Sequence, residues 1–160
     1  MKKSLLIFAL LPLAALAEDV RPLRGAPPAF QAECGSCHVA FPPQMMVADD
    51  WRRVMRSLDK HYGDNASLDE KTRQQLEDFL VRTAGGAKIG AGRTARPGEP
   101  PRLTQTDWFQ RKHREVRRAD WQHPKVKTPA NCAACHTRAA EGSFSEHELV
   151  SPSGGRWEDD

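Results

Sequence analysis

The stretch Cys34-Gly-Ser-Cys-His38 has a counterpart in Cys132-Ala-Ala-Cys-His136, and these two units contain all four cysteines of the 160-residue chain. A Cys-x-x-Cys-His unit is typical of c-type haem attachment. Its two thiols bind the haem covalently, and the histidine that follows becomes the proximal ligand of the iron. We therefore predict two haems, attached through Cys34 and Cys37 and through Cys132 and Cys135, with His38 and His136 as proximal ligands.

Other uses of cysteine pairs fit this pattern less well. A zinc ribbon places its two pairs about 15–20 residues apart, whereas 94 residues separate Cys37 from Cys132. Zinc also gives no reason for a histidine directly after each pair. A thioredoxin-like redox pair needs a strand–helix–strand context, which neither unit has. Disulfides within the pairs stay open as an alternative in an oxidising compartment.

The N-terminus has the three parts of a secretory signal peptide. Lys2 and Lys3 form the positive region, an apolar stretch follows over 5–16, and Ala15-Leu-Ala17 matches a cleavage site. We expect removal of residues 1–17 and a soluble periplasmic product. Covalent attachment of c-type haem after export agrees with this location.

Charge gives no support for nucleic-acid binding. The formal net charge is +3, but cleavage would remove Lys2 and Lys3, and two haems would add four propionates. One local cluster of basic residues lies over 111–118. It reads either as a solvated helix face that pairs with propionates or as a docking patch for an acidic redox partner.

The periodicity predicts an all-α fold with long irregular loops, because no stretch alternates with the period of a strand. One expected helix has a continuous apolar stripe, and the next has an apolar buried side: the stripe consists of Trp51, Val54, Met55, Leu58 and Tyr62, and the buried side of Leu76, Phe79 and Leu80. Ser67 with Glu70 resembles a capping box. Thr104 or Thr106, and Thr128 before Pro129, resemble later helix starts. The expected helices span 29–38, 50–61, 67 to the stop at 85–86, 104–116, and a stretch that begins at 129.

The composition divides the chain into five segments. A Gly/Arg/Pro-rich stretch over 84–101 is typical of a linker. We expect a signal peptide at 1–17, a first haem lobe at 18–83, the linker at 84–101, a second haem lobe at 102–150 and a flexible tail at 151–160.

Each iron also needs a distal ligand or keeps an open site. We predict His61 and His113 as distal ligands, because each lies on the apolar side or edge of an expected helix. The alternatives are two further histidines and three methionines, namely His123, His147, Met45, Met46 and Met55. Met55 belongs to the helix stripe, where packing is its ordinary role.

Four segments together resemble the small bacterial dihaem cytochrome c family. They are Glu33-Cys-Gly-Ser-Cys-His-Val-Ala-Phe-Pro-Pro-Gln-Met-Met46, His61-Tyr-Gly-Asp-Asn-Ala-Ser-Leu-Asp69, Trp108-Phe-Gln-Arg-Lys-His-Arg-Glu-Val116 and Val126-Lys-Thr-Pro-Ala-Asn-Cys-Ala-Ala-Cys-His-Thr-Arg-Ala-Ala140. The family is typified by the soluble partner of a high-spin, oxygen-binding c-type haem protein. The resemblance implies a low-potential electron carrier with two bis-histidine haems.

The resemblance also implies a membrane b-type cytochrome or a small monohaem cytochrome as exchange partner. We expect a monomeric electron carrier rather than an enzyme, because six-coordinate irons exchange electrons without binding substrate. The alternatives are a dihaem peroxidase or a haem-based gas or redox sensor, in which one iron would stay open.

Overall fold

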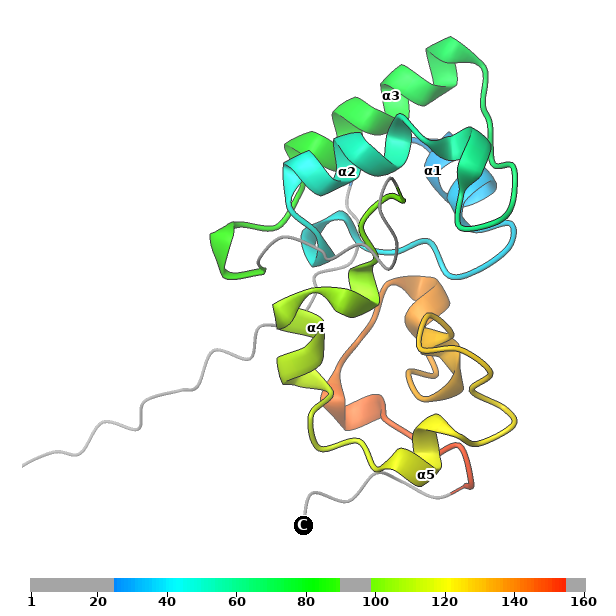
Figure 1. The fold of residues 1–160 in the computed structure, drawn as a ribbon, viewed down its shortest axis with the longest axis vertical. Coiled ribbons are helices and arrows are strands. Elements are labelled where there is room, and N and C mark those ends of the chain that lie inside the picture. Colours follow the sequence, from blue (N-terminus) through cyan, green and yellow to red (C-terminus); the bar gives the residue numbers. More distant parts are fainter. Residues whose placement is uncertain (1–24, 90–98, 155–160) are drawn as a thin grey trace, which may run out of the picture.

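The computed structural model describes residues 25–89 and 99–154, so the expected signal peptide at 1–17 lies outside it. Figure 1 shows α1, α2 and α3 together in the upper part of the molecule and α4 and α5 in the lower part. In the described ranges the chain forms α-helices and short 3-10 turns, with isolated bridges and no strand. The predicted all-α class is confirmed. No described helix is long and apolar enough to cross a membrane.

The upper part is built on α1 (Pro28–Cys34), α2 (Ala48–Met55) and α3 (Glu70–Arg82). Both α1 and α2 pack against α3. Six of the apolar residues predicted to face inward are buried on α2 and α3, namely Trp51, Val54, Met55, Leu76, Phe79 and Leu80. The last two residues of the predicted stripe, Leu58 and Tyr62, lie beyond the end of α2 and are half-buried. The indole of Trp51 also donates a 2.7 Å hydrogen bond to the carbonyl of Pro43, which fixes the chain that enters α2.

The lower part contains α4 (Asp107–Lys112) and α5 (Arg118–Trp121). Thr106, one of the two predicted caps, accepts a 3.1 Å hydrogen bond from the backbone N–H of Phe109, and the helix ends at Lys112 rather than at residue 116. Leu103 and Phe109 belong to the same buried cluster as Phe30 in α1. The hydrophobic core therefore runs from the upper helices into the base of α4.

Three helix boundaries in the upper part differ from the prediction. The first helix ends at Cys34 rather than at residue 38. The second ends at Met55 rather than near residue 61: Ser57 has a non-helical backbone (φ −127°, ψ 29°), and its hydroxyl bonds the carbonyls of Arg53 and Val54. The third is capped by Asp69 rather than Ser67, and it ends at residue 82, before the two glycines at 85–86.

No α-helix starts at Pro129. The hydroxyl of Thr128 accepts from the N–H of Ala130 in a turn, and the second motif forms a 3-10 turn at Cys132–Ala134. Lys127, just before this turn, has a left-handed backbone (φ 61°), which a right-handed helix cannot contain. The prediction also lacked the four-residue α5. Residues 90–98 of the expected linker and 155–160 of the expected tail lie outside the described ranges.

Candidate haem sites

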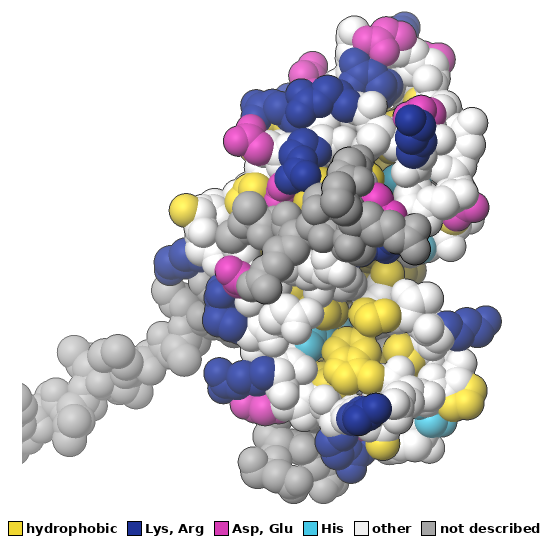
Figure 2. All heavy atoms as spheres, viewed as in Figure 1, with side chains coloured by type: hydrophobic (Ala, Val, Ile, Leu, Met, Phe, Trp, Pro, Cys, Tyr) yellow, Lys and Arg dark blue, Asp and Glu magenta, His cyan; other side chains and the backbone are white. Residues whose placement is uncertain are grey.

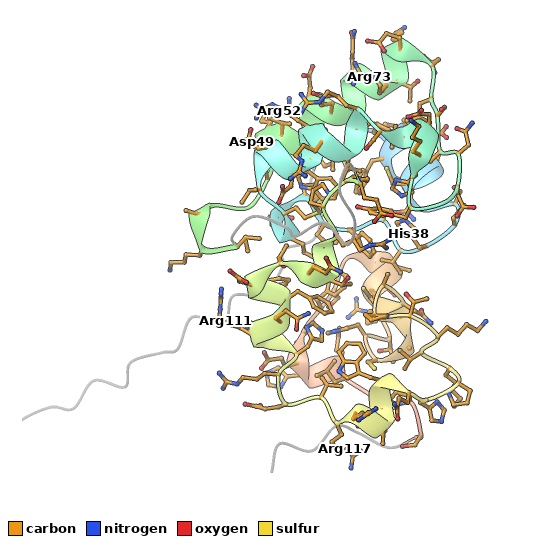
Figure 3. All side chains as sticks on the ribbon, viewed as in Figure 1. His38, Asp49, Arg52, Arg73, Arg111 and Arg117 are labelled. Carbon is orange, nitrogen blue, oxygen red and sulfur yellow. The ribbon has the colours of Figure 1, made fainter. Side chains whose placement is uncertain are left out.

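The first motif places His38 opposite His61. His38 lies in a bend directly after the turn that follows α1, and His61 follows a 3-10 turn at Leu58–Lys60. Their ring centroids are 6.2 Å apart, and their planes differ by 15°. In the view of Figure 3, His38 lies between the upper and lower groups of helices. The structure thus pairs His38 with His61, whereas the sequence left open which distal histidine belongs to which motif.

The second motif places His136 opposite His113. His113 is the C-terminal cap of α4, and His136 follows the 3-10 turn of the second motif. Their ring centroids are also 6.2 Å apart, but their planes differ by 71°. Each motif histidine is therefore paired with one helix-associated histidine from its own part of the chain.

Backbone carbonyls orient one ring in each pair. Nδ1 of His38 lies 2.7 Å from the carbonyl oxygen of Val39, and Nδ1 of His113 lies 2.9 Å from that of Phe109. When Nδ1–H donates to the carbonyl, Nε2 keeps its lone pair for a metal. Nδ1 of His61 and Nδ1 of His136 are buried without a hydrogen-bond partner among the described residues.

Burial keeps three of these imidazoles neutral. Desolvation lowers the pKa of His61, and the neighbouring His38 lowers it further. Desolvation also lowers the pKa of His113, and it lowers the pKa of His136 to about 4 with a contribution from His113. Since only a neutral imidazole binds a metal, these three rings are in the ligating form at neutral pH.

The spacing of both pairs fits one metal ion between two imidazoles. Imidazole nitrogens bind metals at about 2 Å, and each ring centroid lies about 1 Å behind its nitrogen, so two rings on one metal stand about 6 Å apart. Both observed separations, 6.2 Å, match this value. The spacing of the four histidines would therefore suit two irons, one for each pair.

The cysteines do not behave as a redox pair or as a zinc site. All four thiols are free. Burial raises the pKa of Cys34 and of Cys132 to about 11, whereas redox-active pairs have a lowered pKa. In the ranges 25–89 and 99–154, no group of three or more His, Cys, Asp or Glu residues converges on a metal position. Separate thiols beside each histidine pair suit covalent haem attachment instead.

Phenylalanine side chains pack against three of the four paired histidines. Phe41 stacks on His38 with centroids 4.7 Å apart, and Phe109 stacks on His113 at 3.9 Å. Phe144 lies 5.2 Å from His136. The signal in the sequence was the position of Phe41 and Phe144, three and eight residues after the motif histidines, and that of Phe109, one helical turn before His113. These rings supply the apolar walls that a haem needs.

The other candidate ligands lie elsewhere. Nδ1 of His123 accepts from the N–H of Lys125 in a turn, and His147 is exposed in a 3-10 turn at Glu146–Glu148. The three methionines are buried in the hydrophobic core, namely Met45, Met46 and Met55. In these positions the three methionines pack in the core.

Comparison with known proteins agrees with this site chemistry. A family model described as Dihaem cytochrome c matches residues 30–144. Among solved structures, the chain is similar to the diheme cytochrome type c from Shewanella baltica, with 36% identity over 82% of this chain and 97% of that one, at a TM-score of 0.69.

It is also similar to the diheme cytochrome c from Rhodobacter sphaeroides, with 38% identity over 74% of this chain and 96% of that one, at a TM-score of 0.61. A search of the curated proteins found no match. The family match covers both Cys-x-x-Cys-His motifs, which fit covalent attachment of two haems. The chain belongs to the dihaem cytochrome c family.

Proposed function

We propose that this protein is a periplasmic, low-potential electron carrier whose two irons are both closed by histidine pairs. As a dihaem cytochrome c it has an electron-transfer role, and its haem irons supply reversible one-electron chemistry when bound. The observation that carries the finer proposal is the 6.2 Å spacing within both pairs, His38 with His61 and His113 with His136.

The chain's own residues keep both positions closed and fixed. The carbonyls of Val39 and Phe109 hold His38 and His113 in one orientation, so the ligands need little rearrangement when an electron arrives. Two imidazoles, rather than imidazole and methionine, favour a low potential, because a methionine ligand raises it. The buried positions of the methionines support this ligand set.

The proposed location rests on the N-terminal sequence, with its lysines, apolar stretch and Ala15-Leu-Ala17. A membrane b-type cytochrome or a similar donor would reduce the protein, and a soluble haem protein such as a small monohaem cytochrome would accept the electron. Fractionation of cells that produce the full chain, with mass spectrometry of the product, tests the location. We expect a periplasmic protein that begins at Glu18 and carries two haem masses.

One experiment separates a carrier from an enzyme or a sensor with an open iron. The reduced protein is mixed with carbon monoxide and its absorption spectrum recorded, and the same sample is then mixed with an oxidised monohaem cytochrome. We expect a spectrum that carbon monoxide leaves unchanged, followed by rapid electron exchange. Carbon monoxide binding at either iron, or rapid turnover of peroxide, would contradict the proposal.

A further inference from the structure

The two segments that carry the distal histidines have opposite charge. Residues 107–127, which include His113, contain seven Lys or Arg and three Asp or Glu. Residues 57–70, which include His61, contain one Lys and four Asp or Glu. The segment that carries His113 therefore has a net positive charge, and the segment that carries His61 has a net negative charge.

The basic side chains of the second segment reach solvent. The side chains of Arg114 and Arg117 are 73% and 69% exposed, and they form ion pairs with Glu115 and Asp120 of their own segment. Three more are exposed and form no ion pair with a described residue, namely Arg118, Lys125 and Lys127. Exposed ion pairs are weak, so this surface keeps a net positive potential.

Figure 2 shows where these charges lie relative to the second site. Hydrophobic side chains gather on the visible face of the lower part beside a histidine, and Lys and Arg side chains lie around their margins. The ring of Trp121, which is partly buried, stands 5.8 Å from the ring of His113. An apolar centre with a charged rim is the usual anatomy of a protein–protein docking site.

We propose that this basic face, residues 107–127 around His113, docks an acidic redox protein that exchanges electrons at the second haem. The inference rests on the proposed electron-carrier function. Electron transfer slows steeply with distance, so a partner must dock beside the site it uses. Opposite charge raises the rate of encounter and orients the partner, while a small interface lets it leave again.

The rival reading is that the arginines pair with the propionates of the second haem and serve only that haem. The two readings differ in what charge reversal changes. A docking face alters the rate of reaction with a charged protein and leaves the haem itself unchanged. Propionate pairing alters the reduction potential and the reaction with any reductant.

The test uses the double variant Arg114→Glu/Arg118→Glu of the full protein. The matched control, Lys71→Glu/Arg82→Glu on α3, makes the same charge change at two exposed residues of the upper part. Stopped-flow absorption follows reduction of each oxidised protein by flavodoxin hydroquinone, an acidic one-electron donor, over a range of ionic strength. Reduced lumiflavin, a small neutral donor, serves as the second reductant.

We expect the unsubstituted protein to react more slowly with flavodoxin as salt rises. The test variant should lose about tenfold or more of the rate at low salt, the control should lose much less, and all three should converge at high salt. The milder pair Arg114→Gln/Arg118→Gln should fall in between, with haem content and visible spectrum unchanged. Lumiflavin should reduce every protein at one rate.

Equal loss in the test and control variants, or no loss in either, would overturn the docking face. A changed lumiflavin rate together with a shifted potential in the test variant would assign the arginines to the propionates instead. If the unsubstituted protein itself bound carbon monoxide, the proposed carrier function would fail, and that result is independent of the charge variants.

Discussion

The ring planes of His38 and His61 lie 15° apart, whereas those of His113 and His136 lie 71° apart, although both pairs have centroids 6.2 Å apart. The distal histidine follows a 3-10 turn in the first pair and caps an α-helix in the second. One ligand spacing is thus reached from two unrelated local structures. The two sites share the distance between the rings but not the angle between their planes.

The ring that a backbone carbonyl orients is a different member of each pair. A carbonyl bonds the motif histidine, His38, in the first pair, but the distal histidine, His113, in the second. Burial also differs, since His38 is exposed while burial lowers the pKa of His136 to about 4. The two sites should therefore be distinguishable by experiment, and the following changes test that difference.

Removal of one distal imidazole has the largest expected effect. In His61→Ala or His113→Ala, one of the two irons loses a ligand, so half of the low-spin absorption should become high-spin and the reduced protein should bind one carbon monoxide. Absorption spectra and carbon monoxide titration measure this. His123→Ala is the control and should behave as the unsubstituted protein. A low-spin spectrum in His61→Ala would mean that another residue closes the first iron.

Gly85→Ala should destabilise the upper part of the molecule. A Cβ at Gly85 would collide with the carbonyl oxygen of Gln44 and the side chain of Ile89, while the N–H of Gly85 donates a 2.8 Å bond to the carbonyl of Met46. We expect a loss of about 1–3 kcal/mol in the free energy of unfolding, measured by urea denaturation.

The neighbouring glycine gives a matched control. A Cβ at Gly86 would meet no atom within 4 Å, so Gly86→Ala should change stability by less than about 0.5 kcal/mol. Equal effects of the two substitutions would show that the close approach at Gly85 is unimportant.

Thr106→Ala should weaken the helix that presents His113. The Thr106 side chain is fully buried, donates to the carbonyl of Leu103 at 2.9 Å and caps Phe109. Loss of such a cap costs about 1–2 kcal/mol, again measured by urea denaturation. Thr106→Ser keeps both hydrogen bonds and should recover most of the loss. Failure of Ser to recover more than Ala would argue against the cap.

The smallest effect concerns acid at the start of α3. A hydrogen bond from Thr72 lowers the pKa of Asp69, and hydrogen bonds from Arg73 and Gln74 lower the pKa of Glu70 to about 2. Because both are lowered in the folded protein, their stabilisation is present at neutral pH. It should disappear as pH falls from about 4.5 towards 2. Urea midpoints of Asp69→Asn/Glu70→Gln should fall less over this interval than those of the unsubstituted protein. An equal fall would refute the assignment.

Much of the site chemistry could be predicted from sequence because it resides in residue types and short spacings. The motifs identified the haems, and Thr106 was correctly named as one of two possible caps. The apolar repeat identified the buried faces of α2 and α3. Each of these signals depends only on residues within a turn or two of one another.

The position of His61 could not be derived in the same way. The prediction placed it on a continued helix, but α2 ends at Met55, and Tyr62 then takes a left-handed backbone, φ 53°. The phenol of Tyr62 donates a 2.5 Å hydrogen bond to the carbonyl of Pro101, and Arg102 lies over its ring. The turn that carries His61 is thus held, through Tyr62, by a segment 39 residues further along the chain, and local periodicity does not encode such a contact.

Electron paramagnetic resonance of the oxidised protein tests most directly whether each iron lies between two imidazoles. Parallel rings act on the same iron d orbital and separate the orbital energies, whereas perpendicular rings act on two orbitals equally and leave them nearly degenerate. We predict two low-spin signals of equal intensity. The 15° pair should give a rhombic signal and the 71° pair a highly anisotropic one. A high-spin signal from either iron would contradict the account.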